Sequence, residues 1–365
     1  MPRVCHISPV HALADNRVFL KECQSLRHAG YEVVWVVQHD RDEVVDGVQV
    51  IALRPVRSLL RRWLVTGAEA FWKAYRTRSA LYHFHDPEFI PWALLLRLTG
   101  ARVVYDIHED YVSSVSQKSY IPPVLRGVSA HLAGAAERIC TAGFARVIAE
   151  RYYEERFPHA VKVLNYPILD ADDTPCRRSS GQLIYTGNVH PYRGAHVHAR
   201  IPGLVPGTSV SFIGKCTESL HRTLLSENET HREQLSFVGV GGVVPYTEIS
   251  NRYREGEWLA GLAIFPPNEH LEKKELTKFF EYMQFGIPII ASNFPTWRRL
   301  VEENGCGICV DPNDDDAIAA AVTRLRDDPE LWRTMSENGM QTVRQKYSWN
   351  SQAASLMELY ERLLR

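Results

Sequence analysis

The sequence predicts a protein of two α/β domains, each built on a parallel sheet. The chain has 365 residues, which is long for one hydrophobic core and suits two domains of ordinary size. Near the N-terminus, a strand, an amphipathic helix and a second strand follow one another at the spacing of a parallel βαβ unit. A second strand followed by a glycine-bearing loop and a helix begins near residue 183.

Composition and charge describe a globular protein and give no sign of nucleic-acid binding. Hydrophobic residues make up 45% and charged residues 23% of the chain, and the formal net charge is −1. Seven cysteines, an odd number, favour a reducing compartment over a disulfide framework. The start MPRVCHIS leads directly into a strand, and no apolar run approaches the roughly 20 residues of a membrane span. We therefore expect a cytoplasmic protein.

The N-terminal part contains the elements of the first predicted sheet. Strands are expected over residues 3–8, 31–37, 48–53, 80–84 and 102–105. A helix is expected over residues 15–29, with Asp15 as its N-cap and Gly30 as its stop. The loop SPVHALADNR lacks the G-x-G-x-x-G of a dinucleotide site, which counts against dehydrogenase chemistry.

A basic, aromatic segment follows the third strand. Residues 54–78 carry seven Lys/Arg and one Glu among Leu, Trp, Phe and Tyr. Such a helix either lies on an anionic membrane surface or packs its apolar stripe into the core as an ordinary surface helix. The sequence leaves both interpretations open.

Histidines and carboxylates follow two strands of the first sheet. One strand leads into His85 and the other into His108, Glu109 and Asp110. Ligands of parallel sheets bind at the carboxyl ends of strands, so these residues are candidates for a site. The alternative for each is an ordinary surface residue.

Three patterns in the sequence contain residues that can bind a metal. His83 and His85 share one face of a strand, but the sequence places no third ligand beside them. The C-x-x-C at residues 306–309 stands alone beside a turn, and the acidic run at residues 170–173 lies in a polar linker, where solvated charge is expected. We therefore expect no metal and no other cofactor.

The second half repeats the alternation of strand and helix. After a linker over residues 168–181, strands are expected over residues 183–186, 210–214, 235–239, 258–266 and 305–312. The acidic residues 314–316 should cap a helix that extends to residue 325. The last helix, over residues 348–364, has Ala354, Met357, Tyr360 and Leu363 at helical spacing.

Two stretches of this half suit a phosphate. The loop GNVHPYRGAH follows a strand, so its glycines let the backbone approach a diphosphate and Arg193 supplies a cation. The stretch ELTKFFEYMQFGIPIIASN begins as a helix that Thr277 can cap, and after Gly286 and Pro288 it continues as a buried strand. Lys278 adds a positive charge at the N-terminus of the helix. Glu281, one turn further, can reach sugar hydroxyls.

This stretch resembles the donor-site signature P-x-K-x-x-E-Y-M-x-x-G-x-P-x-I-x-S of retaining glycosyltransferases of the family 4 type. The resemblance implies the GT-B fold, in which two Rossmann-like domains face each other across a cleft and a C-terminal helix crosses back to the first. We expect an acceptor-binding domain over residues 1–166, a donor-binding domain over residues 167–347 and the crossing helix over residues 348–365.

The resemblance also assigns residues. It implies catalytic roles for His108, Arg193 and Lys278, donor binding by Gly187, Asn188, Gly194, Val240, Thr277 and Glu281, and acceptor-side roles for His85, Glu109 and Asp110. The sequence departs from the family twice. Asn188 replaces the first cation of the G-R-L-x-x-x-K-G loop. Lys273 stands where the family often has the first of two glutamates, so Glu272 or Glu275 would have to make the contact of that glutamate to the donor sugar.

The activity implied is metal-independent transfer, with retention, from a UDP- or GDP-linked sugar to a hydroxyl acceptor, in glycan, envelope polysaccharide or glycoconjugate synthesis. A lipid-linked acceptor would suit attachment of the 54–78 segment to the inner face of the cell membrane. Two alternatives stay open: a sugar-nucleotide epimerase of the same fold and a non-catalytic GT-B partner or scaffold protein.

Overall fold

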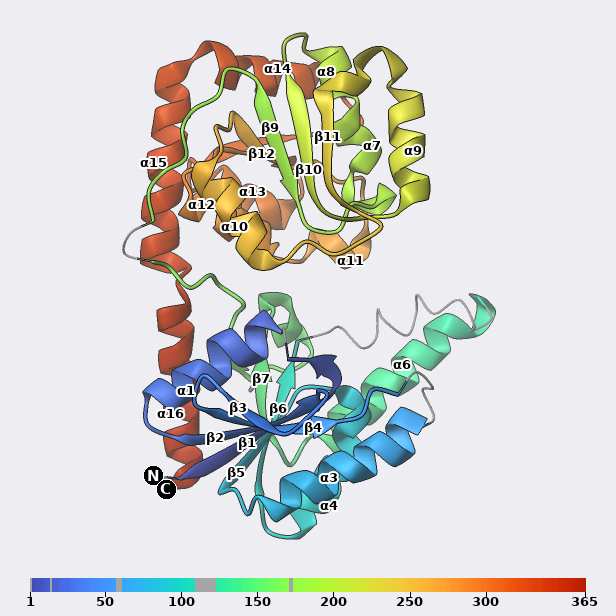
Figure 1. The fold of residues 1–365 in the computed structure, drawn as a ribbon, viewed down its shortest axis with the longest axis vertical. Helices are drawn as coiled ribbons and strands as arrows, with labels where there is room; N and C mark the ends of the chain where they lie inside the picture. Colours follow the sequence, from blue (N-terminus) through green and yellow to red (C-terminus); the bar gives the residue numbers. More distant parts are fainter. Residues whose placement is uncertain (1, 14, 57–60, 109–122, 171–172) are drawn as a thin grey trace. The chain divides into compact units, whose positions relative to one another are not determined.

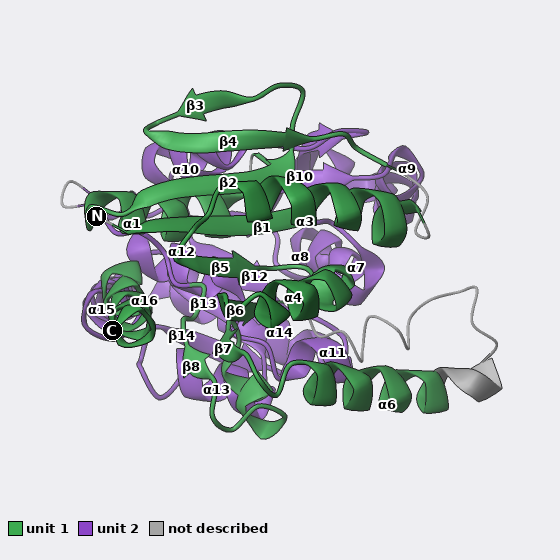
Figure 2. Ribbon diagram, turned by 90° about the horizontal axis from the view of Figure 1, so that it is seen from below, with its two compact units in different colours: residues 1–165, 349–365 green, residues 166–348 purple. Residues whose placement is uncertain are grey.

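The computed structural model describes residues 2–13, 15–56, 61–108, 123–170 and 173–365 (Figure 1). The chain divides into two compact units, coloured separately in Figure 2. Unit 1 comprises Met1–Asn165 and Trp349–Arg365, and unit 2 comprises Tyr166–Ser348. All seven cysteines are free.

Unit 1 is built on a sheet with the strand order β3-β4-β2-β1-β5-β6-β7-β8. The strands are β1 (Arg3–Ala12), β2 (Glu32–Gln38), β3 (Glu43–Val45), β4 (Val48–Leu53), β5 (Leu81–Phe84), β6 (Arg102–Ile107), β7 (Ala145–Ile148) and β8 (Val161–Lys162). Only the pair β3 and β4 is antiparallel among these described neighbours. The edge strand β3 was not predicted, because three residues are too few to show a period.

The helices of unit 1 cover both faces of this sheet. They are η1 (Asn16–Cys23), α1 (Gln24–His28), η2 (Arg62–Thr66), α3 (Gly67–Arg76), η3 (Pro87–Phe89), α4 (Ile90–Leu98), α6 (Pro123–Cys140), η4 (Arg151–Glu155) and α16 (Trp349–Leu364). The helix predicted over residues 15–29 is confirmed, although its first part, η1, is π-helical. Asp15 caps it by accepting a 2.8 Å hydrogen bond from the Val18 amide, and Gly30 ends it with φ 89°.

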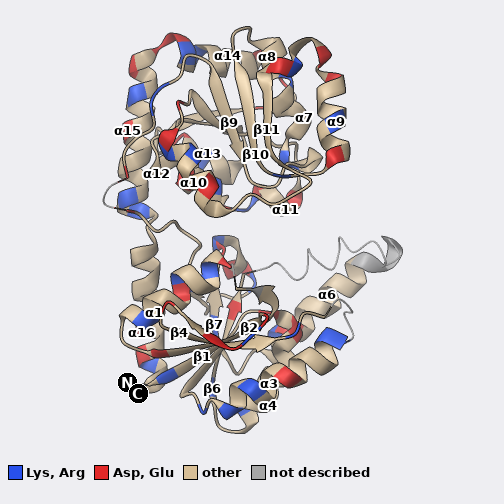
Figure 3. Cartoon of the chain, viewed as in Figure 1, with Lys and Arg blue, Asp and Glu red and all other residues tan. Residues whose placement is uncertain are grey.

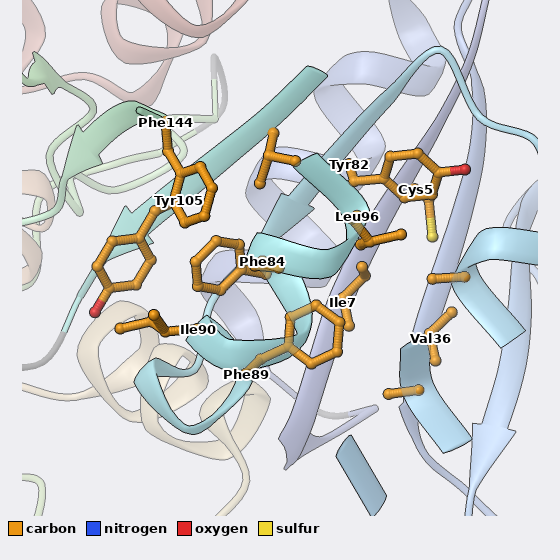
Figure 4. Packing of buried hydrophobic residues seen from close by; sticks show 14 of the residues in the cluster. Cys5, Ile7, Val36, Tyr82, Phe84, Phe89, Ile90, Leu96, Tyr105 and Phe144 are labelled. Atoms are coloured by element: carbon orange, nitrogen blue, oxygen red, sulfur yellow. The ribbon is translucent and has the colours of Figure 1, made fainter. Parts of the chain in front are cut away.

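Alternate residues of each strand face opposite sides of the sheet, so unit 1 has two apolar layers. Figure 4 shows the first layer, where Ile7, Phe84 and Tyr105 pack with Phe89 of η3. The second layer lies between the other face of the sheet, η1 and α16. His6 points into this second layer because it lies one residue before Ile7.

Strand β1 is longer than predicted. It was expected to end at residue 8, but it continues to Ala12. The extension is anchored where the Val10 amide donates a 3.0 Å hydrogen bond to the Asp86 carboxylate at the end of β5. This places His11 beside Asp86, a contact that no local pattern indicates.

Unit 2 is built on a parallel sheet with the order β11-β10-β9-β12-β13-β14. The strands are β9 (Gln182–Thr186), β10 (Ser209–Cys216), β11 (Leu235–Val240), β12 (Ala260–Ala263), β13 (Ile289–Ser292) and β14 (Gly307–Val310). Each of them lies within or overlaps a stretch predicted as a strand. The chain enters the sheet at its centre and winds outward in both directions, as in a doubly wound fold.

The helices of unit 2 are η5 (Pro191–Arg193), α7 (Ala195–Ala199), α8 (Ile201–Leu204), α9 (Glu218–Glu227), η6 (Glu229–Gln234), α10 (Tyr246–Glu255), α11 (Glu269–Glu272), α12 (Thr277–Gln284), α13 (Pro295–Val301), α14 (Asp315–Asp327) and α15 (Pro329–Lys346). Asp314 caps α14, as predicted, and accepts a 2.9 Å hydrogen bond from the Ala317 amide. The long helix α15 was not predicted.

The acidic linker differs from the expectation at one residue. Residues 171 and 172 lie outside the described residues, but Asp173 is buried and not solvated. Its carboxylate pairs with Arg254 at 3.1 Å and accepts a hydrogen bond from Gln284 of α12. The linker therefore anchors α12 from outside the sheet.

Helix α16 returns to unit 1, as the GT-B resemblance implies. The face it buries is centred on Leu356, Leu359 and Tyr360, whereas Ala354, which was expected on that face, is exposed. The Trp349 indole donates a 2.8 Å hydrogen bond to Ser25 of α1.

The basic segment forms η2 and α3, with residues 57–60 outside the described residues. Ala70 and Ala74 of α3 are buried against the sheet, so the helix does place a stripe in the core. On the other side of the helix, Trp72 and Tyr75 are exposed. Within the described ranges, no helix combines the length and the apolar character needed to cross a membrane.

Candidate functional site

Two glycines shape the loop after β9 in unit 2. Gly187 has φ 96°, and its amide donates a 2.9 Å hydrogen bond to the Ile213 carbonyl of β10. Gly194 has φ 75°, and a Cβ atom there would lie 1.9 Å from the Ile264 carbonyl oxygen. Both positions require glycine, because a side chain would be strained at either and would collide at Gly194.

Helix α12 presents its first turn to this loop. Its N-cap is Leu276, which makes no side-chain cap, so the prediction that Thr277 caps the helix is wrong. Thr277 is the exposed first residue of the helix. Lys278, expected to add a positive charge at this N-terminus, is buried.

The Lys278 ammonium is the most unusual charge in unit 2. Its Nζ atom lies 3.6 Å from the centre of the Tyr185 ring and 4.0 Å from the position that a Cβ of Gly187 would occupy. Nζ has no hydrogen-bond partner among the described residues. Contact with an aromatic face recovers only part of the hydration that a buried ammonium loses.

Arg193 of η5 is the second cation at this position. Burial lowers the pKa of the Lys278 ammonium well below its usual range, and the positive charge of Arg193 lowers it further, while Glu281 opposes the shift. The Nε atom of Arg193 is also buried and lacks a partner in the described part of the chain. Two close cations with spare donors form a site that favours an anion.

Glu281 lies one turn further along α12 and is oriented by two buried hydroxyls. The Tyr253 hydroxyl donates a 3.0 Å hydrogen bond to Oε2 of Glu281, and the Thr186 hydroxyl lies 2.5 Å from the Tyr253 hydroxyl. Burial, followed by the Glu281 charge, raises the pKa of Tyr253 well above its usual range, so it stays a donor.

Three other residues expected to bind the donor, Asn188, Val240 and Glu272, lie in different parts of unit 2. Asn188 is exposed, and its carbonyl accepts a 2.8 Å hydrogen bond from the Tyr185 hydroxyl. Val240 lines a hollow of about 720 Å³ between α9, η6 and β11, together with Phe237. Glu272 accepts a hydrogen bond from the Asn268 amide at 2.9 Å.

Glu275, the other substitute for the missing family glutamate, accepts a 3.3 Å hydrogen bond from the Tyr166 hydroxyl. Lys273 stands at the position of the missing carboxylate and is exposed. The two replacement candidates are therefore both engaged with neighbouring groups of unit 2.

Unit 1 carries its own polar group at the carboxyl ends of β1, β5 and β6. Nε2 of His108 lies 3.2 Å from Nε2 of His11, which in turn lies 3.4 Å from the Asp86 carboxylate. Burial lowers the pKa of His108, so the imidazole is neutral near neutral pH. Glu109 and Asp110 lie outside the described residues.

His85 does not fit the acceptor-side role suggested by the sequence, because its side chain is fully buried. Its Nδ1 lies 3.1 Å from Asp106 of β6, and its Nε2 lies 3.0 Å from Nδ1 of His6. Asp106 is held by two hydrogen bonds from the Arg17 guanidinium, at 3.0 and 3.1 Å.

Sequence reasoning missed most of this interior group. It found no third ligand for His83 and His85, whereas the fold brings His6 and Glu22 to them. We call these four residues the histidine cluster. A weak signal was available: the first helix carries an Arg and a Glu, Arg17 and Glu22, on the face that the sheet buries.

Part of unit 2 matches the model of a known family. Residues 205–342, from the end of α8 to the last turns of α15, match the model "Glycosyl transferases group 1". The lipopolysaccharide core biosynthesis glycosyltransferase LpsD of Rhizobium meliloti is 36% identical over 85 residues, which cover 23% of this chain and 24% of that protein. The MMP alpha-(1->4)-mannosyltransferase of Mycolicibacterium hassiacum is 34% identical over 85 residues, 23% of this chain and 21% of that protein. The matches thus span about a quarter or less of these relatives.

Solved structures resemble the whole chain. The sucrose-phosphate synthase of Thermosynechococcus elongatus has a TM-score of 0.74 at 17% identity, covering 100% of this chain and 99% of that one. The Anabaena protein HepE in complex with UDP-glucose has a TM-score of 0.70 at 12% identity, covering 99% and 100%. At these identities the likeness concerns the fold.

Proposed function

We propose that this chain transfers a sugar from a nucleoside diphosphate sugar to a hydroxyl acceptor. The chain has the GT-B fold, and its residues 205–342 match the glycosyl transferases of group 1. The observation that carries the proposal is the buried Lys278 ammonium beside Arg193 and Gly187, with spare donors on both cations. A diphosphate is the ligand that such a pair fits best.

The proposed donor lies along the loop after β9 and the first turn of α12. Its diphosphate sits between Lys278 and Arg193, where the positive φ of Gly187 leaves room for a close approach of the backbone. The N-terminal end of α12 adds its dipole. Glu281, held from one side by Tyr253, receives hydroxyls of the nucleoside ribose.

Transfer breaks the bond between the anomeric carbon and the diphosphate oxygen, and negative charge develops on the leaving group. Lys278 and Arg193 stabilise that charge, and the loss of either is expected to slow transfer on the order of 10²-fold. The acceptor oxygen attacks the anomeric carbon, and its proton leaves with the diphosphate. We infer retention by attack on the same face, from the resemblance to the family 4 type.

In unit 1, His108 is the group proposed to contact the reacting sugars, supported by His11 and Asp86. Its neutral imidazole can donate to or accept from a hydroxyl. UDP is the first donor class to test, because the HepE structure holds UDP-glucose.

The first test is a binding panel of UDP, GDP, ADP, CMP and dTDP, with and without Mg²⁺, read as shifts of the unfolding temperature. One diphosphate should stabilise the wild type without Mg²⁺. Lys278→Ala and Arg193→Ala should each weaken its binding by about tenfold or more, or about 1.4 kcal/mol. Lys346→Ala, a change at an exposed lysine of α15, is the matched control and should bind as wild type. Equal affinity in all variants would refute the donor site.

Product analysis separates the transferase from the two alternatives. A transferase consumes the sugar nucleotide only with an acceptor and releases the diphosphate. An epimerase of the same fold would convert the sugar nucleotide without an acceptor, and a scaffold protein would bind the nucleotide without turnover.

We further propose that unit 1 docks on an anionic membrane surface on the cytoplasmic side, where a lipid-linked acceptor would be presented. Large apolar side chains are exposed on the neighbouring helices η2, α3, α4 and α6; they are Leu64, Val65, Trp72, Tyr75, Leu94, Leu95, Leu98, Val128, Leu132 and Ile139. Figure 3 shows basic residues along α3 and the segment before it. Exposed arginines among these apolar groups match an anionic lipid surface.

Vesicle sedimentation tests this docking. The protein should bind vesicles with about one third anionic lipid, bind neutral vesicles less and dissociate as salt increases. Trp72→Ala combined with Leu98→Ser should weaken binding severalfold. Val243→Ser, at an apolar residue of unit 2 that is 77% exposed, is the control and should change nothing. Equal binding to neutral vesicles, or no loss in the double variant, would contradict the proposal.

A further inference from the structure

The histidine cluster gathers four potential metal ligands in the interior of unit 1. His6 of β1 and His83 of β5 are direct neighbours across the sheet, and His85 follows two residues later on the same face. Glu22 reaches them from η1, which covers that face. All four side chains are fully buried.

The distances within the cluster suit a small ion. Nδ1 of His6 lies 3.0 Å from Nε2 of His85, and the Oε2 atom of Glu22 lies 3.8 Å from the first and 3.9 Å from the second. In a tetrahedral zinc site with bonds of about 2.0–2.1 Å, ligand atoms are about 3.4 Å apart. The three atoms surround a point about 2.1 Å from each of them, which lies close to their common plane.

Burial and then the nearby Asp106 charge raise the pKa of Glu22 well above its usual range, so an ionised Glu22 needs a cation beyond Arg17. Glu22 and Asp106 are two buried carboxylates that share one guanidinium, since Arg17 lies 3.2 Å from Glu22 and 3.0 Å from Asp106. Neither oxygen of Glu22 accepts a hydrogen bond from any residue that the structure describes. A buried carboxylate is costly unless hydrogen bonds or a cation compensate it.

The outer ring nitrogens of His85 and His6 each face a hydrogen-bonding group, as they usually do in histidines that bind a metal. The outer nitrogen of His85, Nδ1, faces the Asp106 carboxylate at 3.1 Å, and the outer nitrogen of His6, Nε2, faces the Tyr360 hydroxyl at 3.1 Å. A hydrogen bond from the outer N–H leaves the inner nitrogen with its lone pair directed at the centre of the cluster.

We propose that unit 1 binds one divalent transition-metal ion, of the class of zinc, between His6, His85 and Glu22. His83 lies beside the site, with its Nδ1 3.8 Å from the same Glu22 oxygen and 2.9 Å from the Tyr360 hydroxyl. Imidazole and carboxylate ligands in a small dry site select such ions over magnesium or calcium. The ion joins β1, β5 and η1, and its burial gives it a structural role.

An ion-free alternative leaves groups unexplained. A chain of hydrogen bonds can run from His85 through His6 to the Tyr360 hydroxyl and on to Nδ1 of His83, which lies 2.9 Å from that hydroxyl. In that chain one proton forms the hydrogen bond between His6 and His85, but no described group donates a hydrogen bond to Glu22. Ion binding moves this proton to Nε2 of His6, where Tyr360 accepts it, and engages Glu22.

Metal analysis of untagged protein, grown and purified with zinc present, tests the proposal. The wild type should contain about one zinc ion per chain. Glu22→Gln keeps the size of the side chain and should lower zinc affinity at least about tenfold. Glu137→Gln is the matched control, since Glu137 is also a buried carboxylate of unit 1 but pairs with Tyr105 and Arg156 outside the cluster. Equal zinc content in the two variants would overturn the proposal.

A second measurement needs no variant and so does not depend on whether Glu22→Gln folds. The wild type is refolded from denaturant with cobalt(II) in place of zinc. A tetrahedral cobalt site gives strong visible absorption bands, which zinc should then abolish by competition. Refolded protein with native circular dichroism, no such bands and less than about 0.1 zinc ion per chain would overturn the proposal.

Discussion

At the scale of single residues, Lys278 is the clearest link between structure and function. A fully desolvated ammonium, close to Arg193 and without a hydrogen-bond partner in the described residues, is unfavourable in the free protein. A bound diphosphate removes that penalty. If the proposed donor binds there, the stability lost at Lys278 in the free protein is recovered on binding.

Proton uptake on nucleotide binding follows from this environment. The pKa of Lys278 is lowered in the free protein and must rise beside an anion, so diphosphate affinity should fall as pH rises between these two pKa values. Calorimetry at several pH values, in buffers of different ionisation enthalpy, should detect protons taken up on binding.

Lys278→Arg is the control for this prediction, because a guanidinium stays charged throughout the range. It should bind the diphosphate without proton uptake. Identical uptake in wild type and variant would assign the titration to another group.

At the scale of elements, α16 shows how a terminal helix completes a distant domain. It follows unit 2 in the chain, yet it buries Leu356, Leu359 and Tyr360 in unit 1 beside η1. Apolar burial of about 1.5–3 kcal/mol per large side chain supports this docking.

Leu356→Ala should therefore destabilise the protein by about 2–5 kcal/mol, because Leu356 is fully buried and leaves a cavity. Glu358→Ala, two residues away on the exposed side of the same helix, should change stability by less than about 0.5 kcal/mol. Urea unfolding followed by circular dichroism measures both. Similar effects of the two changes would show that α16 contributes little to unit 1.

At the scale of the whole molecule, the two units carry separate polar sites. Unit 2 holds the two cations proposed to bind the donor, and unit 1 holds His108 and the histidine cluster. Each sheet presents its loops at the carboxyl ends of its strands, as doubly wound folds do.

Hydrogen exchange should locate the donor in one unit. With the diphosphate that binds, peptides covering residues 183–194 and 277–284 should exchange more slowly, because the ligand stabilises local structure there. Peptides of β2 and β4 in unit 1 should exchange unchanged. Protection confined to unit 1 would place the nucleotide elsewhere.

The sequence by itself determined the fold class and the main strands of both sheets. Hydrophobic runs and caps are local signals, so Asp15 and Asp314 could be identified as N-caps without a structure. The GT-B fold, expected from the donor-site signature, is confirmed by the solved structures that match the whole chain. The edge strand β3 was too short to show a pattern, and α15 was missed.

Tertiary structure alone decided which polar side chains meet. His6 and His85 are 79 residues apart and Tyr360 is 354 residues from His6, yet the three are in contact because parallel strands and the returning helix bring them together. Lys278 was identified as a candidate cation from the sequence, but its burial against the Tyr185 ring and beside Gly187 depends on the loop after β9. Periodicity assigns a residue to a face of its own element, but burial and partners depend on what packs on that face, which distant parts of the chain supply.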